Sequence, residues 1–504
     1  MFDLATSFAA SVERDPQAIA IIDGDVRLSY GAWAQRVGAL AGWLSGRGVK
    51  QGDHVVTALQ NSWEAASLHW ACQFIGAVIT PINWRATSEE LAYVLGDSDA
   101  VLMVHEAISA DAARAAGAMK TVKVVEIGEI DIANLPAAPL PVPRASADEL
   151  SLMLYTSGTT GRPKGVPRRH KAERAAAIAH VAQNTYRHGE ITLGVMPLYH
   201  TMGVRSLLAM SLIGGSFVCL RRFDPAEALR LIVTERVTCL YLVPTLYHAL
   251  LELPDFAKAD ISHVRLLGFA GASMTDGLLK RLQEAFRPQL FVNHYGSSEV
   301  YTCAIHQNAP AKPGSAGRAA LNQRLRVVDV AARDPEAICP PGVEGEIIAD
   351  LKGDESFEGY WHRPDGDAKS LIKGWYFTGD MGRFDEEGDL FVTGRTDDMI
   401  ITGGENVSPV EVESFISMLP GIGDVAVVGL PDERWGQIVA AFIKAGPDMD
   451  AAKIEAHCRQ GLATHKRPRK IVFVEDLPKS PVGKLLRRLL VAGEYRLAEP
   501  VSSH

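Results

Sequence analysis

Short apolar runs alternate with amphipathic segments over the first 300 residues of the chain. The run "AIAII" at 18–22 precedes a segment with helical spacing at 30–48, and the run "HVVTAL" at 54–59 precedes another at 62–78. Strands that alternate with helices in this way are typical of a parallel sheet covered by helices. We therefore predict an α/β fold with parallel-rich sheets and flanking helices.

The pattern changes after about residue 315. Short apolar runs such as "GEIIAD" (345–350) and "GDLFVTGR" (388–395) are separated by Gly and Asp turns, which favours antiparallel strands in a small β-barrel-like part. A compact α/β tail follows, with a helix predicted to begin at Ser408-Pro409. We expect a large N-terminal domain at 1–395 and a small, mobile C-terminal domain at 396–504.

Composition excludes several classes of protein. A chain of 504 residues is too long for one core, and 47% hydrophobic with 22% charged residues is typical of a globular protein. The net charge of −9 argues against nucleic-acid or acidic-membrane partners. The six cysteines include no CxxC pair, which argues against a zinc site. The N-terminus has no basic region before an apolar run, as a signal peptide would have. No apolar stretch is long enough to cross a membrane. We expect a cytoplasmic enzyme with reduced thiols.

The segment "YTSGTTGRPKG" at 155–165 concentrates hydroxyls, glycines and cations. Successive backbone N–H groups in a Gly-rich turn can point at one anion, and hydroxyls add donors. The spacing differs from a Walker A loop, because Gly158 and Gly161 are separated by two residues and Lys164 is followed by Gly165. From composition alone the segment predicts phosphate binding, with a surface loop as the alternative.

This segment resembles the signature loop of the adenylate-forming superfamily, which contains acyl-CoA synthetases, peptide-synthetase adenylation domains and beetle luciferases. Six further stretches resemble the superfamily's motifs in the same order and extend the likeness over nearly the whole chain: "MPLYH" (196–200), "GFAGASM" (268–274), "NHYGSSE" (293–299), "GWYFTGD" (374–380), "GRTDDMIITGGENVSP" (394–409) and "LPKSPVGK" (477–484). Among its members the chain is most similar to bacterial aryl-CoA ligases of the 4-chlorobenzoate type. The resemblance implies ATP, Mg²⁺ and coenzyme A as cofactor and co-substrates.

The resemblance implies a catalytic role for four residues: Lys484, His200, Glu299 and Asp397. Lys484 would neutralise the charge that builds when a carboxylate attacks the α-phosphate. Glu299 would contact Mg²⁺, and Asp397 would be the hinge of the small domain. ATP or AMP contacts are implied at Thr156, Ser157, Gly158, Thr159, Thr160, Lys164, Gly271, Ala272, Ser273, Asn293, His294, Tyr295, Gly296, Ser297, Ser298, Asp380 and Arg395. Among these, Asp380 would accept both ribose hydroxyls and Tyr295 would stack on adenine.

The tail is basic in an otherwise acidic chain, with eight Lys/Arg against two acids over 461–490. For a ligase this favours a site for CoA phosphates. By resemblance CoA would meet Arg85, Gly403, Gly404, Glu405, Trp435, His465, Arg467 and Arg469.

The acyl pocket implied by the resemblance comprises His200, Thr201, Met202, Ala270, His294, Tyr301 and Thr302. Tyr301 and His294 are bulky, which favours a short, flat acid. We hypothesise that His294 hydrogen-bonds a ring heteroatom or a ring hydroxyl, as in a furoate or a hydroxybenzoate. Arg205 could pair with a second carboxylate in the pocket, but a surface ion pair is the favoured expectation.

Other functions stay open at this point. The chain could activate short or medium-chain fatty acids, load a carrier protein as a stand-alone adenylating enzyme, or bind a nucleotide without turnover. The expected partners are a small carboxylic acid, ATP and CoA, with neither nucleic acid nor membrane, in a monomer or homodimer. Because "PKSPVGK" resembles the acetylation context of bacterial acyl-CoA synthetases, a lysine acetyltransferase and deacetylase acting on Lys484 are also expected.

Overall fold

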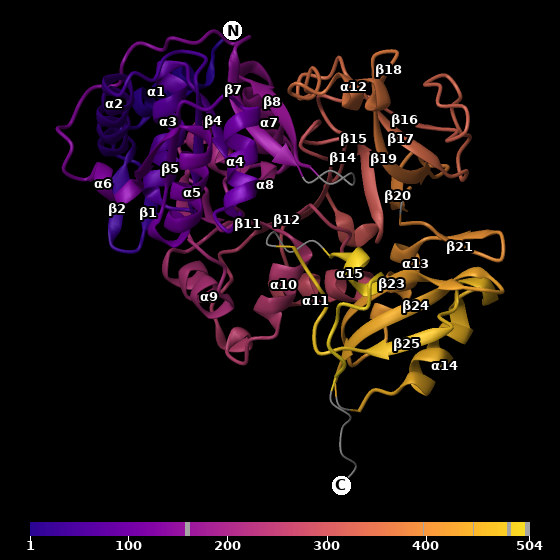
Figure 1. Cartoon of the computed structure of the whole chain (residues 1–504). Helices are drawn as coiled ribbons and strands as arrows, with labels where there is room; N and C mark the ends of the chain where they lie inside the picture. Colours follow the sequence, from indigo (N-terminus) through magenta and orange to yellow (C-terminus); the bar gives the residue numbers. More distant parts are fainter. Residues whose placement is uncertain (157–161, 397, 447, 481–484, 499–504) are drawn as a thin grey trace.

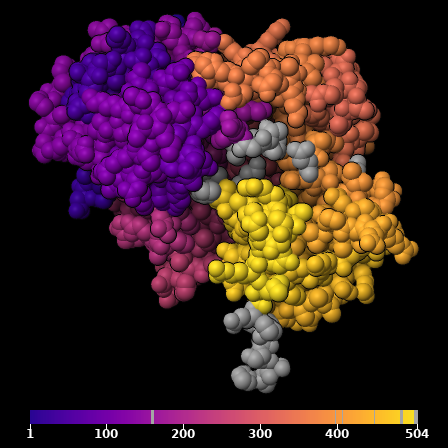
Figure 2. Space-filling view, in the orientation of Figure 1, coloured from indigo at the N-terminus to yellow at the C-terminus, as the bar shows by residue number. Residues whose placement is uncertain are grey.

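A computed structural model describes residues 1–156, 162–396, 398–446, 448–480 and 485–498. The chain up to strand β20 (Leu390–Arg395) forms a large body, and the chain from β21 (Ile400–Thr402) onward forms a smaller one beside it (Figures 1 and 2). Two large sheets within the described ranges build the large body, and a third builds the small one.

The first sheet has six strands in the described part of the chain. Its order is β6 (Lys123–Glu126), β5 (Leu102–His105), β3 (His54–Ala58), β4 (Val78–Pro81), β7 (Leu150–Thr156) and β8 (Lys164–Arg169). All neighbouring pairs are parallel except β7 and β8, which form an antiparallel pair with Thr156 opposite Lys164. The 155–165 segment is therefore the connection between the last two strands of this sheet.

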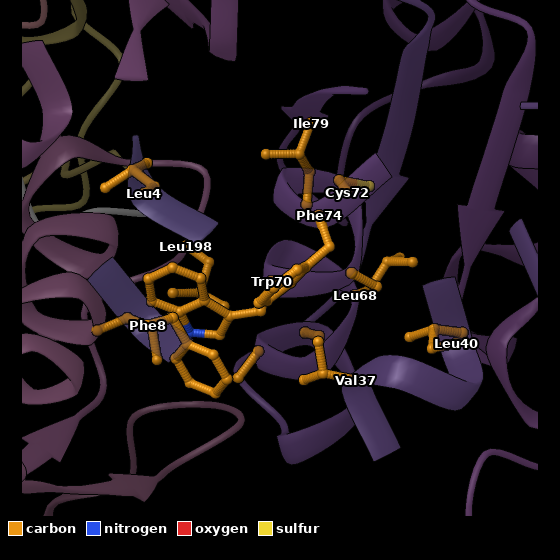
Figure 3. Close-up of a cluster of buried hydrophobic side chains, with 14 of the residues drawn as sticks. Leu4, Phe8, Val37, Leu40, Leu68, Trp70, Cys72, Phe74, Ile79 and Leu198 are labelled. Carbon is orange, nitrogen blue, oxygen red and sulfur yellow. The ribbon is translucent and has the colours of Figure 1, made fainter. Parts of the chain in front are cut away.

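The helices of this part are defined by their caps and their buried faces. Ser62 caps the start of α3 through Ala65 N, and Gly76 ends it at a φ of +72°. Phe8 stacks on Trp70 of α3 at a ring-centroid distance of 4.5 Å, in the core drawn in Figure 3. The helices that carry this core and its surroundings are α1 (Leu4–Arg14), α2 (Tyr30–Gly46), α3 (Trp63–Ile75), α4 (Ser88–Asp97), α5 (Ala110–Lys120) and α6 (Ile127–Ile130).

The second sheet has 14 strands among the described residues, and its first half is parallel. Starting at the edge, β2 (Val26–Ser29) pairs antiparallel with β1 (Ile19–Asp23), which is followed by β10 (Ser216–Cys219), β9 (Ile191–Gly194), β11 (Cys239–Leu242), β12 (Leu266–Phe269) and β13 (Leu290–Tyr295). From β1 to β13 each neighbouring pair is parallel. The helices between these strands are α7 (His170–Gln183), α8 (Thr201–Ile213), α9 (Pro225–Thr234), α10 (Pro244–Leu251) and α11 (Asp276–Phe286).

The same sheet becomes antiparallel after β13. Its remaining order is β14 (Ala304–His306), β15 (Ser315–Ala319), β20, β19 (Trp375–Phe384), β17 (Gly345–Asp350) and β16 (Leu325–Val328), with β18 (Leu371–Ile372) beside β19 and α12 (Pro364–Ser370) before it. Every pair in this half is antiparallel. The change in strand direction thus follows Tyr295, about 20 residues before the change visible in the sequence.

The small body has a five-stranded sheet in the part that the structure describes. Its strands are β22 (Glu405–Val407), β21, β24 (Gly436–Ala445) and β23 (Ile422–Asp432), with β25 (Lys470–Phe473) on β24. The helices are α13 (Pro409–Ser417), α14 (Ala451–Gly461) and α15 (Arg487–Val491). Ser408 caps α13 and Pro409 occupies its first turn, as predicted.

Helix α13 also holds the small body against the large one. Asp276 N donates to Ser414 Oγ at 3.2 Å, and Gly277 N donates to Ser417 Oγ at 3.3 Å. The N-terminus of α11 therefore rests on one face of α13.

The predicted fold class is confirmed: a large N-terminal part of parallel-rich sheets and flanking helices is joined to a small α/β C-terminal part. The predicted barrel-like part consists of antiparallel strands that continue the second sheet. All six cysteines are free. No helix within the described ranges combines the length and the apolar character that a membrane crossing needs.

Candidate active site

The predicted nucleotide residues gather where the second sheet changes from parallel to antiparallel. In open α/β sheets, ligands bind in the crevice outside the carboxyl ends of the strands, and several of these residues lie at or just after the carboxyl ends of β12 and β13. β13 supplies Asn293, His294 and Tyr295, and the turn that follows it supplies Ser297 and Glu299.

Glu299 is held rigidly at this turn. It is 7% exposed, and its carboxylate oxygen Oε1 accepts a hydrogen bond from Tyr360 Oη at 2.8 Å. Its backbone oxygen accepts from Nη1 of the buried Arg168 at 3.1 Å. Among the described residues no side chain hydrogen-bonds its second carboxylate oxygen. Since Mg²⁺ prefers carboxylate oxygens, Glu299 fits the role of a metal contact.

Tyr360 links Glu299 to strand β8 of the first sheet. The Nζ atom of Lys164 lies 4.6 Å from the centre of the Tyr360 ring. Burial raises the pKa of Tyr360, and the charge of Glu299 raises it further, so the hydroxyl stays a donor. Lys164 and Glu299, which are 135 positions apart in the chain, are therefore joined by one aromatic side chain.

Asp380, Arg395 and Tyr295 form a second group on the antiparallel half. Asp380 on β19 lies opposite Arg395 on β20, and Arg395 Nη1 donates to Asp380 Oδ1 at 2.9 Å. Tyr295 Oη donates to Asp380 Oδ2 at 2.7 Å. Burial lowers the pKa of Arg395, but the charge and hydrogen bond of Asp380, together with Tyr376 and Tyr295, outweigh it, and the net pKa is raised. The carboxylate is thus fixed from both sides.

Glycines shape the two loops beside these groups. Gly271 has a φ of +81°, and a Cβ there would lie 3.3 Å from Val243 Cγ1. A Cβ at Gly296 would collide with the carbonyl oxygen of Tyr301, so only glycine permits the tight turn in which Ser297 N donates to Val300 O at 2.9 Å. Ala272, Ser273 and Ser298 lie in the same two loops.

The predicted acyl-pocket residues lie at the start of α8, on β13, and in the loops that follow β12 and β13. His200 caps α8, and its Nδ1 accepts from Met202 N at 3.3 Å. Met202 and Ala270 belong to one buried apolar cluster with Met196, Tyr241 and Val243. The predicted residues Thr201, His294, Tyr301 and Thr302 are buried as well.

Tyr301 belongs to a buried network of charges. Its hydroxyl donates to Glu173 Oε2 at 3.0 Å, and Glu173 is paired with Arg168 at 2.7 Å. The guanidinium groups of Arg168 and Arg205 lie 4.0 Å and 5.0 Å from the ring centre of Tyr301. The ring therefore packs between two buried cations.

The prediction that Arg205 forms a surface ion pair is wrong. Every residue of α8 from 201 to 211 is buried, so Arg205, the charged residue of this helix, does not reach solvent. Arg205 is 2% exposed, and its Nη1 donates to Thr302 Oγ1 at 2.9 Å and to Tyr241 Oη at 3.4 Å. The buried acid Glu355 acts on it only from beyond ion-pair distance.

Several of the predicted CoA residues lie together in the small body. A Cβ at Gly403, which has a φ of +60°, would lie 2.9 Å from Cε3 of Trp435. The guanidinium of Arg469 lies 4.3 Å from the ring centre of Trp435. Gly404 and Glu405 follow in the same β21–β22 hairpin. Trp435 thus has a glycine on one side and a cation against its ring.

The other predicted CoA residues are separate from Trp435. Arg467 donates to the carbonyl oxygen of Leu462 at 2.8 Å and so binds the end of α14, while His465 lies in the short turn before it. Arg85 stacks on Trp84 at 3.6 Å in the large body. In Figure 1, β4 and α4, which flank the Arg85 turn, lie at the left, and the β21–β22 hairpin lies at the right edge.

Six predicted site residues lie outside the described residues: Ser157, Gly158, Thr159, Thr160, Asp397 and Lys484. Thr156 is the last residue of β7 and Lys164 is the first residue of β8, so these two residues flank the first four of the six in the chain. Asn293 Nδ2 donates to Ser315 O at 2.9 Å.

The structure adds residues that the motifs did not indicate, namely Tyr360, Arg168, Glu173, His180, Asn184 and Tyr241. His180 and Asn184 are spaced four apart at the end of α7, which places two polar side chains on one buried face. This spacing is the feature of the sequence from which the pair could have been predicted. Tyr360 offered none, because its partner Glu299 is 61 positions away.

Comparisons with known proteins agree with this geometry. The sequence profile of the family described as "AMP-binding enzyme" matches residues 8–361, and that of the "AMP-binding enzyme C-terminal domain" matches residues 411–484. Long-chain-fatty-acid–CoA ligase FadD13 of Mycobacterium tuberculosis is 33% identical over 95% of this chain and 96% of its own. The 4-chlorobenzoate–CoA ligase of Arthrobacter sp. is 34% identical over 96% of this chain and 93% of its own.

A solved structure extends the likeness to the whole fold. ATP-bound MatB from Rhodopseudomonas palustris superposes with a TM-score of 0.87 and 30% identity, over 98% of this chain and 99% of that one. Family profiles, relatives and fold therefore agree over both bodies of the molecule. The chain belongs to the AMP-binding enzyme family and is an AMP-forming acid–CoA ligase.

Proposed function

We propose that this ligase activates a small cyclic or aromatic carboxylic acid with ATP, forms an acyl-AMP, and then transfers the acyl group to CoA. The observation that carries the proposal is the chain of contacts from Lys164 through Tyr360 to Glu299. It places a cation and a carboxylate that fits Mg²⁺ on the same aromatic side chain, and binding of ATP phosphates requires both kinds of group.

The Asp380 group supports the nucleotide half of this proposal. Its carboxylate is aligned by Tyr295 and Arg395, and two carboxylate oxygens can accept from two neighbouring ribose hydroxyls. The adenosine and the phosphates would then lie along the edge where the sheet changes direction.

The Trp435 group supports CoA as the acceptor. An aromatic ring with Arg469 against it and Gly403 beside it gives a flat surface and a cation for a nucleotide carrying phosphates. A stand-alone enzyme that loads a carrier protein would have no need of this surface.

The acid class is supported by the rings that surround the predicted pocket. The ring centre of Tyr241 lies 4.7 Å from that of His180 and 5.0 Å from that of His294, and Tyr241 also packs in one buried cluster with Met202 and Ala270. A long acyl chain would have to displace these rings, whereas a flat ring could stack among them. The similarity to 4-chlorobenzoate–CoA ligase favours the same class.

The proposal is tested by offering the enzyme Mg·ATP with benzoate, hydroxybenzoates, 2-furoate, hexanoate and palmitate. We expect acid-dependent pyrophosphate exchange without CoA, and acyl-CoA detected by mass spectrometry when CoA is added, with ring acids the best substrates. Preference for palmitate would establish the fatty-acid alternative. Transfer to a holo-carrier protein but not to CoA would establish the carrier-loading alternative.

We further propose that the arrangement with α13 on α11 serves adenylation, and that the part from 396 onward then turns about Asp397. The separation of the β21–β22 hairpin from the Arg85 turn supports this, since CoA would need both (Figure 1). Acetylation of Lys484 would abolish adenylation and spare thioester formation from supplied acyl-AMP. We propose a cytoplasmic monomer or homodimer.

A further inference from the structure

A group of buried polar side chains lies directly beyond the apolar residues of the predicted acyl pocket. Tyr241 packs with Met202 and Ala270, and it also contacts the rings of His180 and His294. The two imidazole rings are themselves 5.1 Å apart. We call His180, Asn184, Arg205, Tyr241 and His294 the Tyr241 group.

Hydrogen bonds within the Tyr241 group fix the orientation of Asn184. Its Nδ2 atom lies 2.8 Å from the carbonyl oxygen of His180, which can only accept. The amide nitrogen must therefore face His180, and the amide oxygen Oδ1 must face Nε2 of His294, 3.2 Å away. The same Nδ2 atom lies 3.1 Å from Nδ1 of His180.

This orientation fixes the tautomers of both imidazoles. His294 donates from Nε2 to Asn184 Oδ1, and His180 accepts at Nδ1 from Asn184 Nδ2. Burial lowers the pKa of both histidines well below the usual value, so both rings are neutral. A neutral imidazole has one donor and one acceptor. Nδ1 of His294 is therefore left as an acceptor, and Nε2 of His180 as a donor.

Three buried polar atoms of the Tyr241 group have no hydrogen-bond partner among the described residues: Nε2 of His180, Nδ1 of His294 and Nε of Arg205. Their side chains are 1%, 3% and 2% exposed, respectively. Buried polar groups are normally hydrogen-bonded, and leaving them unpaired is costly. The unpaired acceptor of His294 and the unpaired donor of His180 belong to rings whose centres are 5.1 Å apart. A hydroxyl group both donates and accepts, so it has the hydrogen-bonding character that this pair of atoms needs.

We propose that the acid substrate carries a hydroxyl group that binds to the Tyr241 group, an inference that rests on the proposed function. The hydroxyl donates to Nδ1 of His294 and accepts from Nε2 of His180 or from the guanidinium of Arg205. A furan oxygen only accepts, and an ionised second carboxylate only accepts, so neither satisfies His294. The sequence suggested that His294 binds either a ring heteroatom or a ring hydroxyl of the acid, and the proposal keeps only the hydroxyl.

The test compares acids of matched size in the full-length enzyme with Mg·ATP. The panel contains benzoate, 3- and 4-hydroxybenzoate, 3- and 4-aminobenzoate, isophthalate, terephthalate and 2-furoate. We expect at least one hydroxybenzoate to exceed benzoate at least about tenfold in kcat/KM for pyrophosphate release, because a site built to bond a hydroxyl discriminates against its absence. The same ratio is expected in acid dissociation constants measured with a non-hydrolysable ATP analogue.

Variants of His294 connect this preference to the residue. His294→Ile removes the acceptor and should reduce the hydroxybenzoate-to-benzoate ratio to about one. His294→Asn places an amide oxygen near the position of Nδ1 and should restore part of the ratio. His69→Phe is the matched control, because His69 is also a buried histidine with an unpartnered Nε2 but lies in α3 outside the group. Its ratio should equal that of the wild type.

Three results would overturn the inference. The first is equal loss on all acids in His294→Ile, and the second is equal use of benzoate and both hydroxybenzoates by the wild type. The third is a preference for isophthalate, terephthalate, furoate or an aminobenzoate over both hydroxybenzoates. Each of them leaves acyl-CoA formation intact, whereas failure of the proposed function would appear as no acyl-CoA from any acid.

Discussion

Asp380 is the residue whose surroundings most clearly define its task. Tyr295 and Arg395 both donate to it, so its carboxylate has a fixed position. We expect Asp380→Asn to raise the KM for ATP at least about tenfold, since hydrogen bonds to charged groups contribute about 1.5–3 kcal/mol. Steady-state kinetics with varied ATP measures this.

The matched control for this prediction is Asp389→Asn. Asp389 lies in the turn between β19 and β20 and is also paired, with Arg318 at 3.2 Å. Its replacement should leave the KM for ATP unchanged. An unchanged KM in Asp380→Asn would remove the ribose contact from the proposed site.

Two lysines are predicted to contribute unequally. Lys164 lies beside Tyr360, where the departing phosphates are proposed to bind, whereas Lys484 is assigned to the α-phosphate only by resemblance. Lys164→Ala should weaken ATP use modestly, and Lys484→Ala should reduce adenylation far more. Pyrophosphate exchange in the two variants gives the order, and the reverse order would contradict the assignment.

At the scale of elements, the β21–β22 hairpin and the turn before β24 are predicted to act in the second half-reaction alone. Trp435→Ala removes the ring between Gly403 and Arg469. We expect thioester formation to slow about five- to thirtyfold, by loss of an aromatic contact worth about 1–2 kcal/mol, while CoA-independent pyrophosphate exchange is unchanged.

Trp43→Ala is the control for that experiment. Trp43 in α2 carries Arg47 at 3.6 Å from its ring, the same kind of pair in another part of the molecule. Both half-reactions should be unaffected by its loss. If Trp435→Ala slows pyrophosphate exchange as much as thioester formation, the division between the two half-reactions is wrong.

The sequence predicted well those features that depend only on residues close together in the chain. Ser408 and Pro409 indicated the start of α13, and cap and first turn depend only on neighbouring residues. The burial of Arg205 follows from α8 being enclosed on all sides, and the apolar residues on every face of "TMGVRSLLAMSLI" were a signal for it. Its partner Thr302 is 97 positions away, so periodicity could not reveal it.

At the scale of the whole molecule, the contact between α11 and α13 is predicted to select one arrangement of the two bodies. A Cβ at Gly277 would collide with the carbonyl oxygen of Ser417. Gly277→Ala should therefore disfavour this arrangement and slow adenylation several-fold, with thioester formation from supplied acyl-AMP unchanged. Gly42→Ala, in a helix with open space at that position, is the control and should change neither.

Buried neutral histidines predict an acid-labile molecule. Burial lowers the pKa of His54 and His170 to about 4 and that of His69 to about 3, below the unfolded value near 6.5. Above pH 6.5 such a histidine is neutral in both the folded and the unfolded state and does not reduce the free energy of unfolding. As the pH falls from 6.5 toward the folded pKa, the histidine is protonated only in the unfolded state, so the free energy of unfolding decreases.

Each such histidine should lower the free energy of unfolding by about 1 kcal/mol when the pH falls from 7 to 5.5. His69→Phe removes one of them, so we expect the variant to lose about 1 kcal/mol less than the wild type over this range. Urea unfolding at both pH values provides the measurement. Equal losses in the two proteins would mean that His69 is charged in the folded state.

Successive residues of β13 serve two different parts of the reaction. His294 points to the face covered by α7, where the acid is proposed to bind, and Tyr295 reaches Asp380, where the nucleotide is proposed to bind. Because side chains alternate across a strand, replacements at position 294 can change which acid is accepted without altering the nucleotide contact. Deleting or inserting one residue in this strand would instead exchange the two faces, so the enzyme can acquire new acids by substitution but not by a change in the length of β13.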